Sequence, residues 1–345
     1  MLSRPASPKT GGLTIRGFIM TKKIRWGILG VAKINERLLP AFARAANAEL
    51  VGIASRSLER AKDAAKAAGI PKAFGSYEAL LGDPEIDAIY NPLPNTLHDD
   101  WTRKAAQPGK HVLCEKPLAP TARECESLVT FCHDKKIKLM DGFMWPHHPR
   151  TAKIKEFLAG GKLGRIERAT GAFTFQLPMD PANIRLQAPL AGGSLLDVGC
   201  YPVYGIRWAL GEEPVRVWAA ARFQFDVDVA MSATLWFADG RMANFDCGFT
   251  QPFRQWLEIV GEKGTLTVPE MWVPRKTNYV VQYDEGETQQ FDAEGHDQIV
   301  CMLENFGRYV LEHKPVVPAP DEAIKSAKVM DALLLSAREG RCVAV

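Results

Sequence analysis

Short apolar runs alternate with helical patterns in the first part of the chain, and this alternation constrains the fold more than any other feature. The runs are 24–29, 50–54, 72–74, 86–90, 112–114 and 137–141. Strands separated by helices usually pair in parallel, and the helices then cover both faces of the sheet. The pattern predicts a doubly wound α/β domain over residues 21–145.

The period becomes strand-like after about residue 166. Apolar and polar residues alternate through 168–177, 215–225, 230–237, 241–249, 256–260, 265–268 and 279–283. Asp239-Gly240 and Glu262-Lys263-Gly264 are hairpin turn signals between these segments. We expect an α+β domain over residues 146–345, in which an open, mostly antiparallel sheet uses its open face to cover the ligand. Helices are expected at 151–159, 297–311 and 320–339.

The composition narrows the classes of partner. The 345 residues carry a net charge of +3, which favours neither nucleic acid nor an anionic membrane, and no apolar run is long enough to span a bilayer. Seven cysteines without a C-x-x-C pattern predict reduced thiols and a cytoplasmic location. We expect no metal site, because the adjacent His147 and His148 have no acidic or cysteine neighbour. Residues 1–20 are expected to be a disordered extension or to lie upstream of the true start.

The turn after the first predicted strand is a degenerate dinucleotide-binding turn. It reads Gly30-Val31-Ala32-Lys33-Ile34-Asn35, with alanine at the second glycine position and asparagine at the third. Glycine allows the tight turn, and small residues let the backbone approach a pyrophosphate at the helix N-terminus. We therefore predict a Rossmann domain with Gly30, Ala32, Lys33 and Ile34 at the cofactor. A small-residue turn without a ligand is the alternative.

The end of the second predicted strand points to the form of the cofactor. NAD-binding domains usually carry Asp or Glu here for the ribose 2′-hydroxyl, whereas this chain has Ser55 and Arg56, with Arg60 one helical turn later. A small residue followed by arginine suits a 2′-phosphate, so NADP is expected, with NAD as the alternative. Arg56 could instead simply end the strand in solvent.

Two further strand ends are expected at the same sheet edge. The loop 91–98 contains Pro94, Asn95 and His98, which could reach the cofactor, although His98 could equally be a first-turn residue of a helix at 97–107. Strand 112–114 ends in Glu115-Lys116-Pro117, where ligands of open α/β sheets bind. A lysine beside such a pocket can have its pKa lowered and transfer protons. The alternative is a strand that ends in solvated charges.

A second polar cluster interrupts the second domain. Gly192-Gly193-Ser194 precedes a helix that ends at Leu210, and Asp197 and Tyr201 lie four residues apart on its first turn, so they share a face. An acid and a phenol together suit acid–base chemistry. Asp197 could instead be a helix cap, and Tyr201 a core aromatic residue.

These motifs together resemble the family of glucose–fructose oxidoreductase and inositol dehydrogenase. Tyrosine stands where inositol dehydrogenases carry histidine, as in the branch with NADP-dependent xylose dehydrogenase and dimeric dihydrodiol dehydrogenase. The motifs that carry the resemblance are Gly27-Ile28-Leu29-Gly30, Pro94-Asn95-Thr96-Leu97-His98, Gly109-Lys110-His111-Val112-Leu113-Cys114-Glu115-Lys116-Pro117 and Asp197-Val198-Gly199-Cys200-Tyr201-Pro202.

The resemblance implies proton transfer by Lys116 and Tyr201, with Asp197 in support. It also implies that Glu115 contacts the ribose–nicotinamide end, that Asn95 and His98 line the cofactor, and that the Lys116–Pro117 bond is cis. A homodimer or homotetramer through the C-terminal sheet is expected. Pro146, where relatives often have arginine, and Asn35, where they have alanine, are departures from the pattern.

The expected reaction is hydride transfer between a CH–OH group of a sugar or cyclic diol and NADP. Tyr201 would be the direct acid/base, and Lys116 would favour its phenolate. Asp197 would orient Lys116 or bind a second substrate hydroxyl. The alternatives are a sugar–sugar oxidoreductase that retains its NADP and a non-catalytic cofactor-binding sensor.

Overall fold

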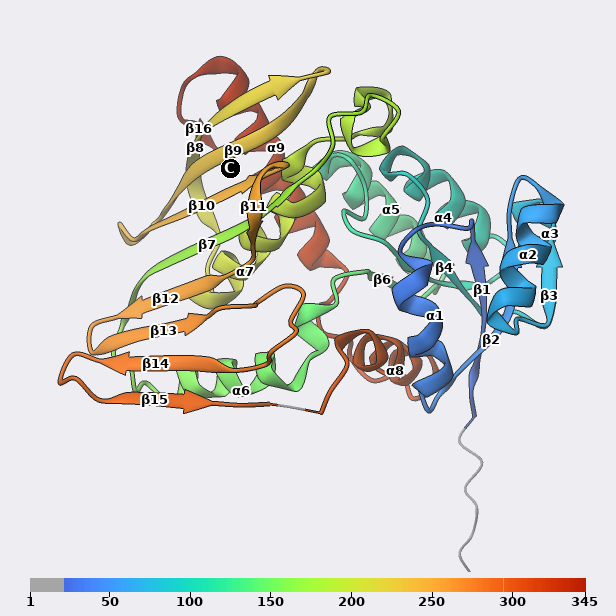
Figure 1. Ribbon diagram of the computed structural model, residues 1–345, viewed down its shortest axis with the longest axis horizontal. Helices are drawn as coiled ribbons and strands as arrows, with labels where there is room; N and C mark the ends of the chain where they lie inside the picture. Colours follow the sequence, from blue (N-terminus) through green and yellow to red (C-terminus); the bar gives the residue numbers. More distant parts are fainter. Residues whose placement is uncertain (1–21, 294) are drawn as a thin grey trace, which may run out of the picture.

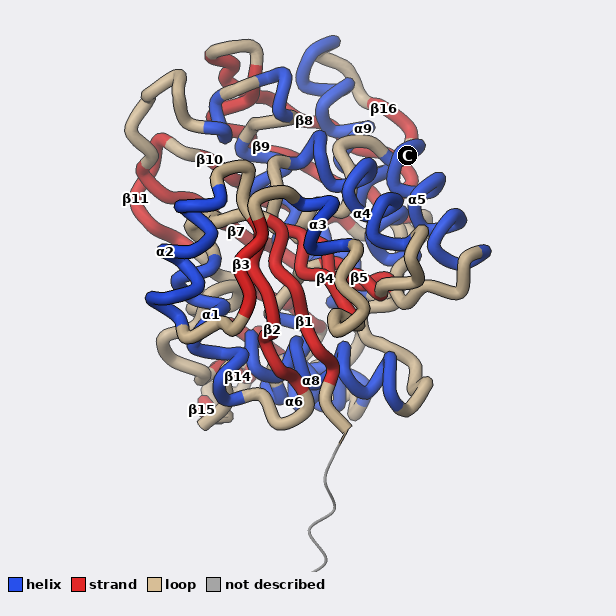
Figure 2. Tube along the Cα trace, turned by 90° about the vertical axis from the view of Figure 1, so that its right-hand side faces the viewer, coloured by secondary structure: helices blue, strands red, loops and turns tan. Residues whose placement is uncertain are grey.

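The computed structural model describes residues 22–293 and 295–345, so the expected extension at residues 1–20 lies outside the described residues. Its first sheet has the predicted strands, all parallel, in the order β3-β2-β1-β4-β5-β6. Figure 2 shows β3, β2, β1, β4 and β5 side by side in this order. This is the strand order of a dinucleotide-binding Rossmann sheet. The strands are β1 (Ile24–Leu29), β2 (Ala48–Ala54), β3 (Lys72–Phe74), β4 (Ala88–Asn91), β5 (His111–Cys114) and β6 (Leu139–Asp141).

Three of the helices between these strands, α2, α3 and α5, begin at capping residues. Ser57, Ser76 and Thr121 each accept a hydrogen bond from a backbone N–H of the first turn, and Thr121 forms a reciprocal capping box with Glu124. Such caps satisfy N–H groups that have no partner inside the helix. The helices are α1 (Asn35–Arg44), α2 (Leu58–Ala68), α3 (Tyr77–Leu81), α4 (His98–Ala106) and α5 (Ala122–Asp134).

A helix from the end of the chain returns to the first sheet. α8 (Gln298–Leu311) packs against α1 and β2, beside the first sheet in Figure 1. The Phe306 ring lies 4.9 Å from the ring of Trp26 on β1, and the Trp26 ring lies 5.5 Å from Phe42 on α1. One core therefore joins the sheet to a segment almost 300 residues away in the sequence.

The second sheet is mostly antiparallel, as predicted, with β7 and β10 as a parallel pair. Its order is β15-β14-β13-β12-β7-β10-β9-β8-β16, and β11 pairs with β7 outside this path. Strands β11, β15 and β16 were not predicted from the sequence. The strands are β7 (Ile166–Gln176), β8 (Pro214–Gln224), β9 (Val227–Phe237), β10 (Met242–Gly248), β11 (Thr250–Arg254), β12 (Leu257–Gly261), β13 (Gly264–Val268), β14 (Tyr279–Tyr283), β15 (Thr288–Phe291) and β16 (Val343–Ala344).

The two faces of this sheet differ. α7 (Cys200–Leu210) and α9 (Asp321–Glu339) pack on one face, where Pro202 contacts Gly171 so closely that a Cβ at Gly171 would lie 3.2 Å from it. The opposite face carries Trp218, Thr234 and Asn244. The remaining helical segments are α6 (Pro149–Ala159), the short helices 95–97, 145–147, 184–186 and 188–190, and a π-helix (Leu195–Gly199).

Candidate active site

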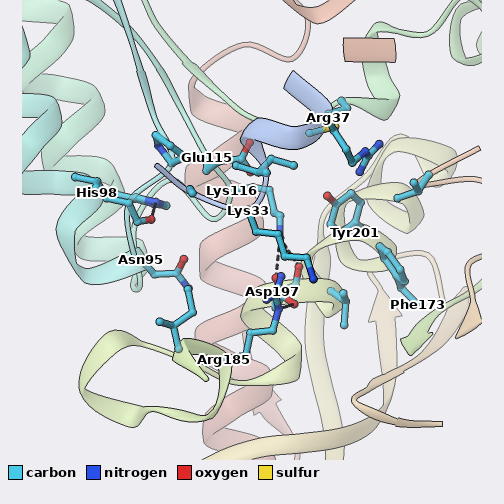
Figure 3. A pocket seen from close by; sticks show the side chains of 18 of the residues that line it. Lys33, Arg37, Asn95, His98, Glu115, Lys116, Phe173, Arg185, Asp197 and Tyr201 are labelled. Atoms are coloured by element: carbon cyan, nitrogen blue, oxygen red, sulfur yellow. Dashed lines mark hydrogen bonds and ion pairs between the residues drawn. The ribbon is translucent and has the colours of Figure 1, made fainter. Parts of the chain in front are cut away.

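A cavity of about 280 Å³ lies between the carboxyl edge of the first sheet and the helix-covered face of the second (Figure 3). Phe173 on β7 lines it and packs against Tyr201 of α7, with ring centres 5.0 Å apart. Because α7 and Phe173 are on the same face of the sheet, the expectation that the open face covers the ligand is wrong. Alternation identifies two faces but does not tell which one a helix will cover.

Lys116 and Asp197 meet in this cavity. The Lys116 ammonium donates to the Asp197 backbone carbonyl at 2.6 Å and to its carboxylate Oδ1 at 3.1 Å. The Lys116–Pro117 peptide is cis, as the resemblance implied. The strand end and the distant helix start are thus joined through both the backbone and the side chain of Asp197.

Tyr201 completes the group. The Lys116 ammonium lies over its ring, 5.2 Å from the centre, and Phe143 packs edge-on against the ring at 5.2 Å. The Tyr201 hydroxyl has no hydrogen-bond partner among the described residues, and the residue lines the cavity. Its hydroxyl is therefore available to a bound molecule.

The charges at this centre differ from one sequence-based expectation. Although burial disfavours a charged amine, the Asp197 carboxylate raises the pKa of Lys116 well above its usual value. The expected lowering of the lysine pKa is wrong for this state of the site. Burial raises the pKa of Tyr201, and the Lys116 cation only partly opposes that rise. Lys116 is thus a fixed cation beside a neutral phenol.

Arg185 is a residue that the sequence analysis missed. Its Nε donates to Asp197 Oδ2 at 2.6 Å, so Asp197 lies between two cations. Burial opposes the ionised carboxylate, but Lys116 and Arg185 together lower the pKa of Asp197 to about 2. Arg185 is in a short helix between strands, where no periodic pattern marks a side chain that reaches a residue of another element.

The turn at Gly30 fits a dinucleotide. Gly30 has a φ of +94°, and a Cβ there would lie 3.3 Å from Leu93, so the position needs glycine. The buried Asn35 side chain donates to the Gly30 carbonyl at 3.0 Å and fastens the turn from within. Ala32, Lys33 and Ile34 line the cavity at the start of α1, and no side chain caps this helix start. The departure at Asn35 is therefore compatible with an anion at this helix N-terminus.

The end of β2 lies directly beside this turn. The Gly30 N–H donates to the Ala54 carbonyl at 2.8 Å, and the buried Ser55 follows. Arg56 and Arg60 are exposed, and neither has a carboxylate partner among the described residues. Two uncompensated cations at this point match the expected place of a 2′-phosphate.

Tyr77 on α3 was also missed by the sequence analysis. Its hydroxyl lies 3.6 Å from where a Cβ of Gly30 would be. Burial raises the pKa of Tyr77, and the positive charges of Arg56 and Arg60 oppose that rise, so all three side chains share one neighbourhood. Its position at the start of a short helix gave no sequence signal for a ligand.

The loop after β4 is tied in place by side chains that were expected to face the cofactor. Asn95 lines the cavity and donates to the Ala191 carbonyl at 2.8 Å. His98 is fully buried at the start of α4, and its ring nitrogens lie 2.8 Å from the Pro117 carbonyl and 2.7 Å from the Leu93 carbonyl. Both nitrogens of His98 thus face backbone carbonyls of the protein, and the single N–H of the neutral ring donates to one of them. Pro94, which precedes Asn95, borders the smaller hollow beside Arg185.

Glu115 also lines the cavity, and Tyr90 on β4 holds its carboxylate in place. It accepts a hydrogen bond from the Tyr90 hydroxyl at 2.5 Å, and burial raises its pKa.

The paired histidines are used structurally: His148 accepts from the Arg150 N–H at 3.1 Å, and Asn305 lies 2.8 Å from His147 Nδ1. Across residues 22–293 and 295–345, no group of three His, Cys, Asp or Glu side chains could hold a metal ion.

Comparisons with known proteins agree with the fold of this chain. Residues 24–143 match the family model described as oxidoreductase family, NAD-binding Rossmann fold, and residues 151–267 match the GFO/IDH/MocA C-terminal domain. The D-xylose 1-dehydrogenase (NADP(+)) 2 of Haloferax volcanii is 38% identical over 324 residues, covering 92% of this chain and 98% of that protein.

Two further proteins extend the comparison. The trans-1,2-dihydrobenzene-1,2-diol dehydrogenase of Xenopus tropicalis is 33% identical over 78% of this chain and 81% of its own length. The crystal structure of the aldose-aldose oxidoreductase from Caulobacter crescentus, complexed with glycerol, is 27% identical with a TM-score of 0.87. It covers 94% of this chain and all of that chain.

Proposed function

Because the chain belongs to the GFO/IDH/MocA family of NAD(P)-binding oxidoreductases, we propose that its cavity interconverts a CH–OH group and a carbonyl on a sugar or cyclic diol. The observation that carries this proposal is the convergence of Lys116, Asp197 and Tyr201 at the carboxyl edge of the Rossmann sheet. In this proposal residues 21–145 bind the cofactor and residues 146–345 supply most of the substrate contacts.

The residues of the chain would divide the proton transfer among them. When bound, the nicotinamide would accept or supply the hydride. Tyr201, whose hydroxyl is the free one, would give its proton to the carbonyl oxygen in the reducing direction and become a phenolate, and in the oxidising direction that phenolate would take the proton back from the substrate hydroxyl as the hydride departs. The Lys116 cation stabilises the phenolate that forms, and Asp197 holds Lys116 over the ring. Lys116 therefore contributes a fixed positive charge, and Tyr201 contributes the proton that moves.

The cavity walls support a ring with hydroxyls on one side. Phe173, Phe175, Ile184 and Val273 form an apolar wall, while Lys116, Asp197 and Arg185 form a polar one. Apolar walls take up the C–H face of a ring, and a few polar groups fix its orientation. The Arg185 guanidinium uses Nε for Asp197, which leaves its terminal nitrogens for a second substrate hydroxyl.

We assign a preference for NADP over NAD to Ser55, Arg56 and Arg60. Arginine pairs well with phosphate through its planar array of donors, and no Asp or Glu lies between Ala54 and Leu58 to bind the free ribose hydroxyl. The similarity to a dehydrogenase named for NADP(+) supports this preference. The pyrophosphate would lie at Ala32, Lys33 and Ile34, at the start of α1.

The open face of the second sheet supports a homodimer or homotetramer. Trp218 and Met242 are exposed there, at 38% and 46%, beside polar residues such as Asn244.

A cytoplasmic location is supported by the cysteines, all seven of which are free. No helix of the described chain is long and apolar enough to cross a membrane.

A second candidate is a sugar–sugar oxidoreductase that keeps its NADP between the two half-reactions, which the similarity to the aldose-aldose oxidoreductase favours. The test is the absorbance and fluorescence of freshly purified protein, with aldoses and diols added before any cofactor. A reduced-nicotinamide signal without added NADP supports the second candidate, and a signal only after NADP supports the dehydrogenase. Absence of any signal with intact NADP binding would refute both and favour a sensor.

A further inference from the structure

A buried carboxylate outside the cavity holds the segment that carries Asp197. Asp228 on β9 is only 2% exposed, and its Oδ2 accepts from the Ser194 hydroxyl at 2.6 Å and from the Leu195 backbone N–H at 2.7 Å. Ser194 and Leu195 begin the π-helix (Leu195–Gly199). Asp228 therefore caps this π-helix from a different strand, as an N-cap residue would from within the chain.

The other oxygen of Asp228 explains the preceding glycine. Gly193 has a φ of +116°, and a Cβ there would lie 2.4 Å from Asp228 Oδ1. The Gly193 carbonyl accepts from the Asp197 N–H at 3.2 Å, and the Gly193 N–H donates to the Arg185 carbonyl at 2.9 Å. One carboxylate thus lies against the residue that connects Arg185 to Asp197.

We propose that Asp228 is a positioning residue for the reaction, because it fixes the π-helix so that Asp197 presents both its carbonyl and its carboxylate to Lys116. The inference rests on the proposed function. π-helical turns occur frequently at functional sites, and here the turn sets the two acceptors that hold the lysine. A small rotation of the turn would release Lys116 from the Tyr201 ring, and misplacements of this size are costly in catalysis.

The surroundings of Asp228 add a pH dependence. Burial raises its pKa to about 6, although its hydrogen bonds oppose the rise. Among the described residues, the titratable group that interacts with it is the Cys247 thiol on β10, which lies 3.7 Å from the Ser194 hydroxyl and whose pKa burial raises. Phe223 on β8 pairs with it, and no ion pair to Asp228 is present in the described part of the chain. Protonation below about pH 6 would therefore weaken the cap without another charge compensating.

The test compares Asp228→Asn with Ser194→Ala and the control Asp246→Asn. Asp246 is on the neighbouring strand and pairs with Arg254 on the other face of the sheet, so its loss should leave turnover unchanged. We expect Asp228→Asn to lower kcat about tenfold without changing the Kd for NADP, and Ser194→Ala to lower it less. The fall in kcat below about pH 6 should be present in the wild type and absent in Asp228→Asn.

A second readout does not depend on turnover. Lys116 should react faster with an amine-selective reagent in Asp228→Asn and Ser194→Ala than in the wild type, as measured by peptide mass spectrometry. Unchanged kcat, pH profile and Lys116 reactivity in both variants would overturn the positioning role. If Asp228→Asn does not fold, Ser194→Ala decides. A wild type that turns over no sugar or diol refutes only the proposed function, because the Lys116 reactivity still tests the positioning.

Discussion

The ammonium of Lys116 lies over the face of the Tyr201 ring, 5.2 Å from its centre, and its hydrogen bonds go to Asp197 instead of to the phenol. The lysine is therefore held by its own counterion and acts on the tyrosine through space. This geometry assigns different roles to Lys116 and Tyr201, which the sequence alone could not distinguish. Tyr201 is placed to exchange a proton, and Lys116 is placed to stabilise the charge that results.

Replacement of Lys116 by methionine should sharply reduce turnover. Methionine keeps most of the side-chain volume, and Asp197 retains Arg185 as a partner, so no buried carboxylate is left alone. We expect kcat to fall about 10²- to 10⁴-fold with the Kd for NADP largely unchanged. Steady-state kinetics and a fluorescence titration measure the two quantities. Lys104→Met, which replaces a partly exposed lysine paired with Asp100, is the control. Near-normal turnover in Lys116→Met would contradict the mechanism.

Removal of the Tyr201 hydroxyl should abolish most of the activity without loss of stability. Phenylalanine preserves the edge-on packing against Phe143 and Phe173, and the hydroxyl has no partner in the described chain to lose. A decrease in kcat of about 10²- to 10⁴-fold is expected at an unchanged Tm. The matched control is Tyr204→Phe, one turn along α7 and outside the cavity lining. If Tyr204→Phe lost as much activity as Tyr201→Phe, the result would contradict a specific acid/base role of Tyr201.

Arg56→Ala should weaken NADP binding far more than NAD binding. Arg56 is exposed and has no carboxylate partner among the described residues, so its loss disturbs no structural ion pair. A charge-assisted contact with a phosphate group suggests a loss of about tenfold or more for NADP. Titration of both cofactors against Arg56→Ala and the nearby Lys62→Ala measures it. Equal losses for the two cofactors would reject the 2′-phosphate role.

Asp141→Asn should stabilise the protein, increasingly so as the pH rises. Asp141 is 4% exposed, its Oδ1 has no hydrogen-bond partner, and burial raises its pKa to about 7. Between about pH 4 and pH 7 the folded protein keeps a proton that the unfolded chain releases. The free energy of unfolding therefore falls as the pH rises from about 4 to about 7. The Tm advantage of Asp141→Asn should therefore be larger at about pH 8 than at about pH 5. A pH-independent Tm difference would show that the carboxyl is not protonated on folding.

The periodic parts of the chain were predictable, and the long-range contacts were not. The first sheet and most strands of the second follow from runs and alternation, because these patterns report burial directly. The β8–β9 turn has positive φ at Phe225 and Asp226, 55° and 61°, and phenylalanine, unlike aspartate, rarely adopts this conformation, so Phe225 gives no signal of such a turn. The sequence also does not show which residue of another element will contact the end of a strand. Lys116 and Tyr201 could be found from their motifs, whereas Arg185 and Asp228 gain their roles only from the elements that face them.

The return of α8 to the first sheet limits how the protein can be divided. A fragment that stops at residue 145 would leave Trp26 and Phe42 without Phe306 and expose the apolar face that α8 covers. Chimaeras that exchange the cofactor half between relatives must therefore carry α8 with it, although the helix is encoded near the other end of the gene. Recombination at the apparent boundary would separate halves of one core.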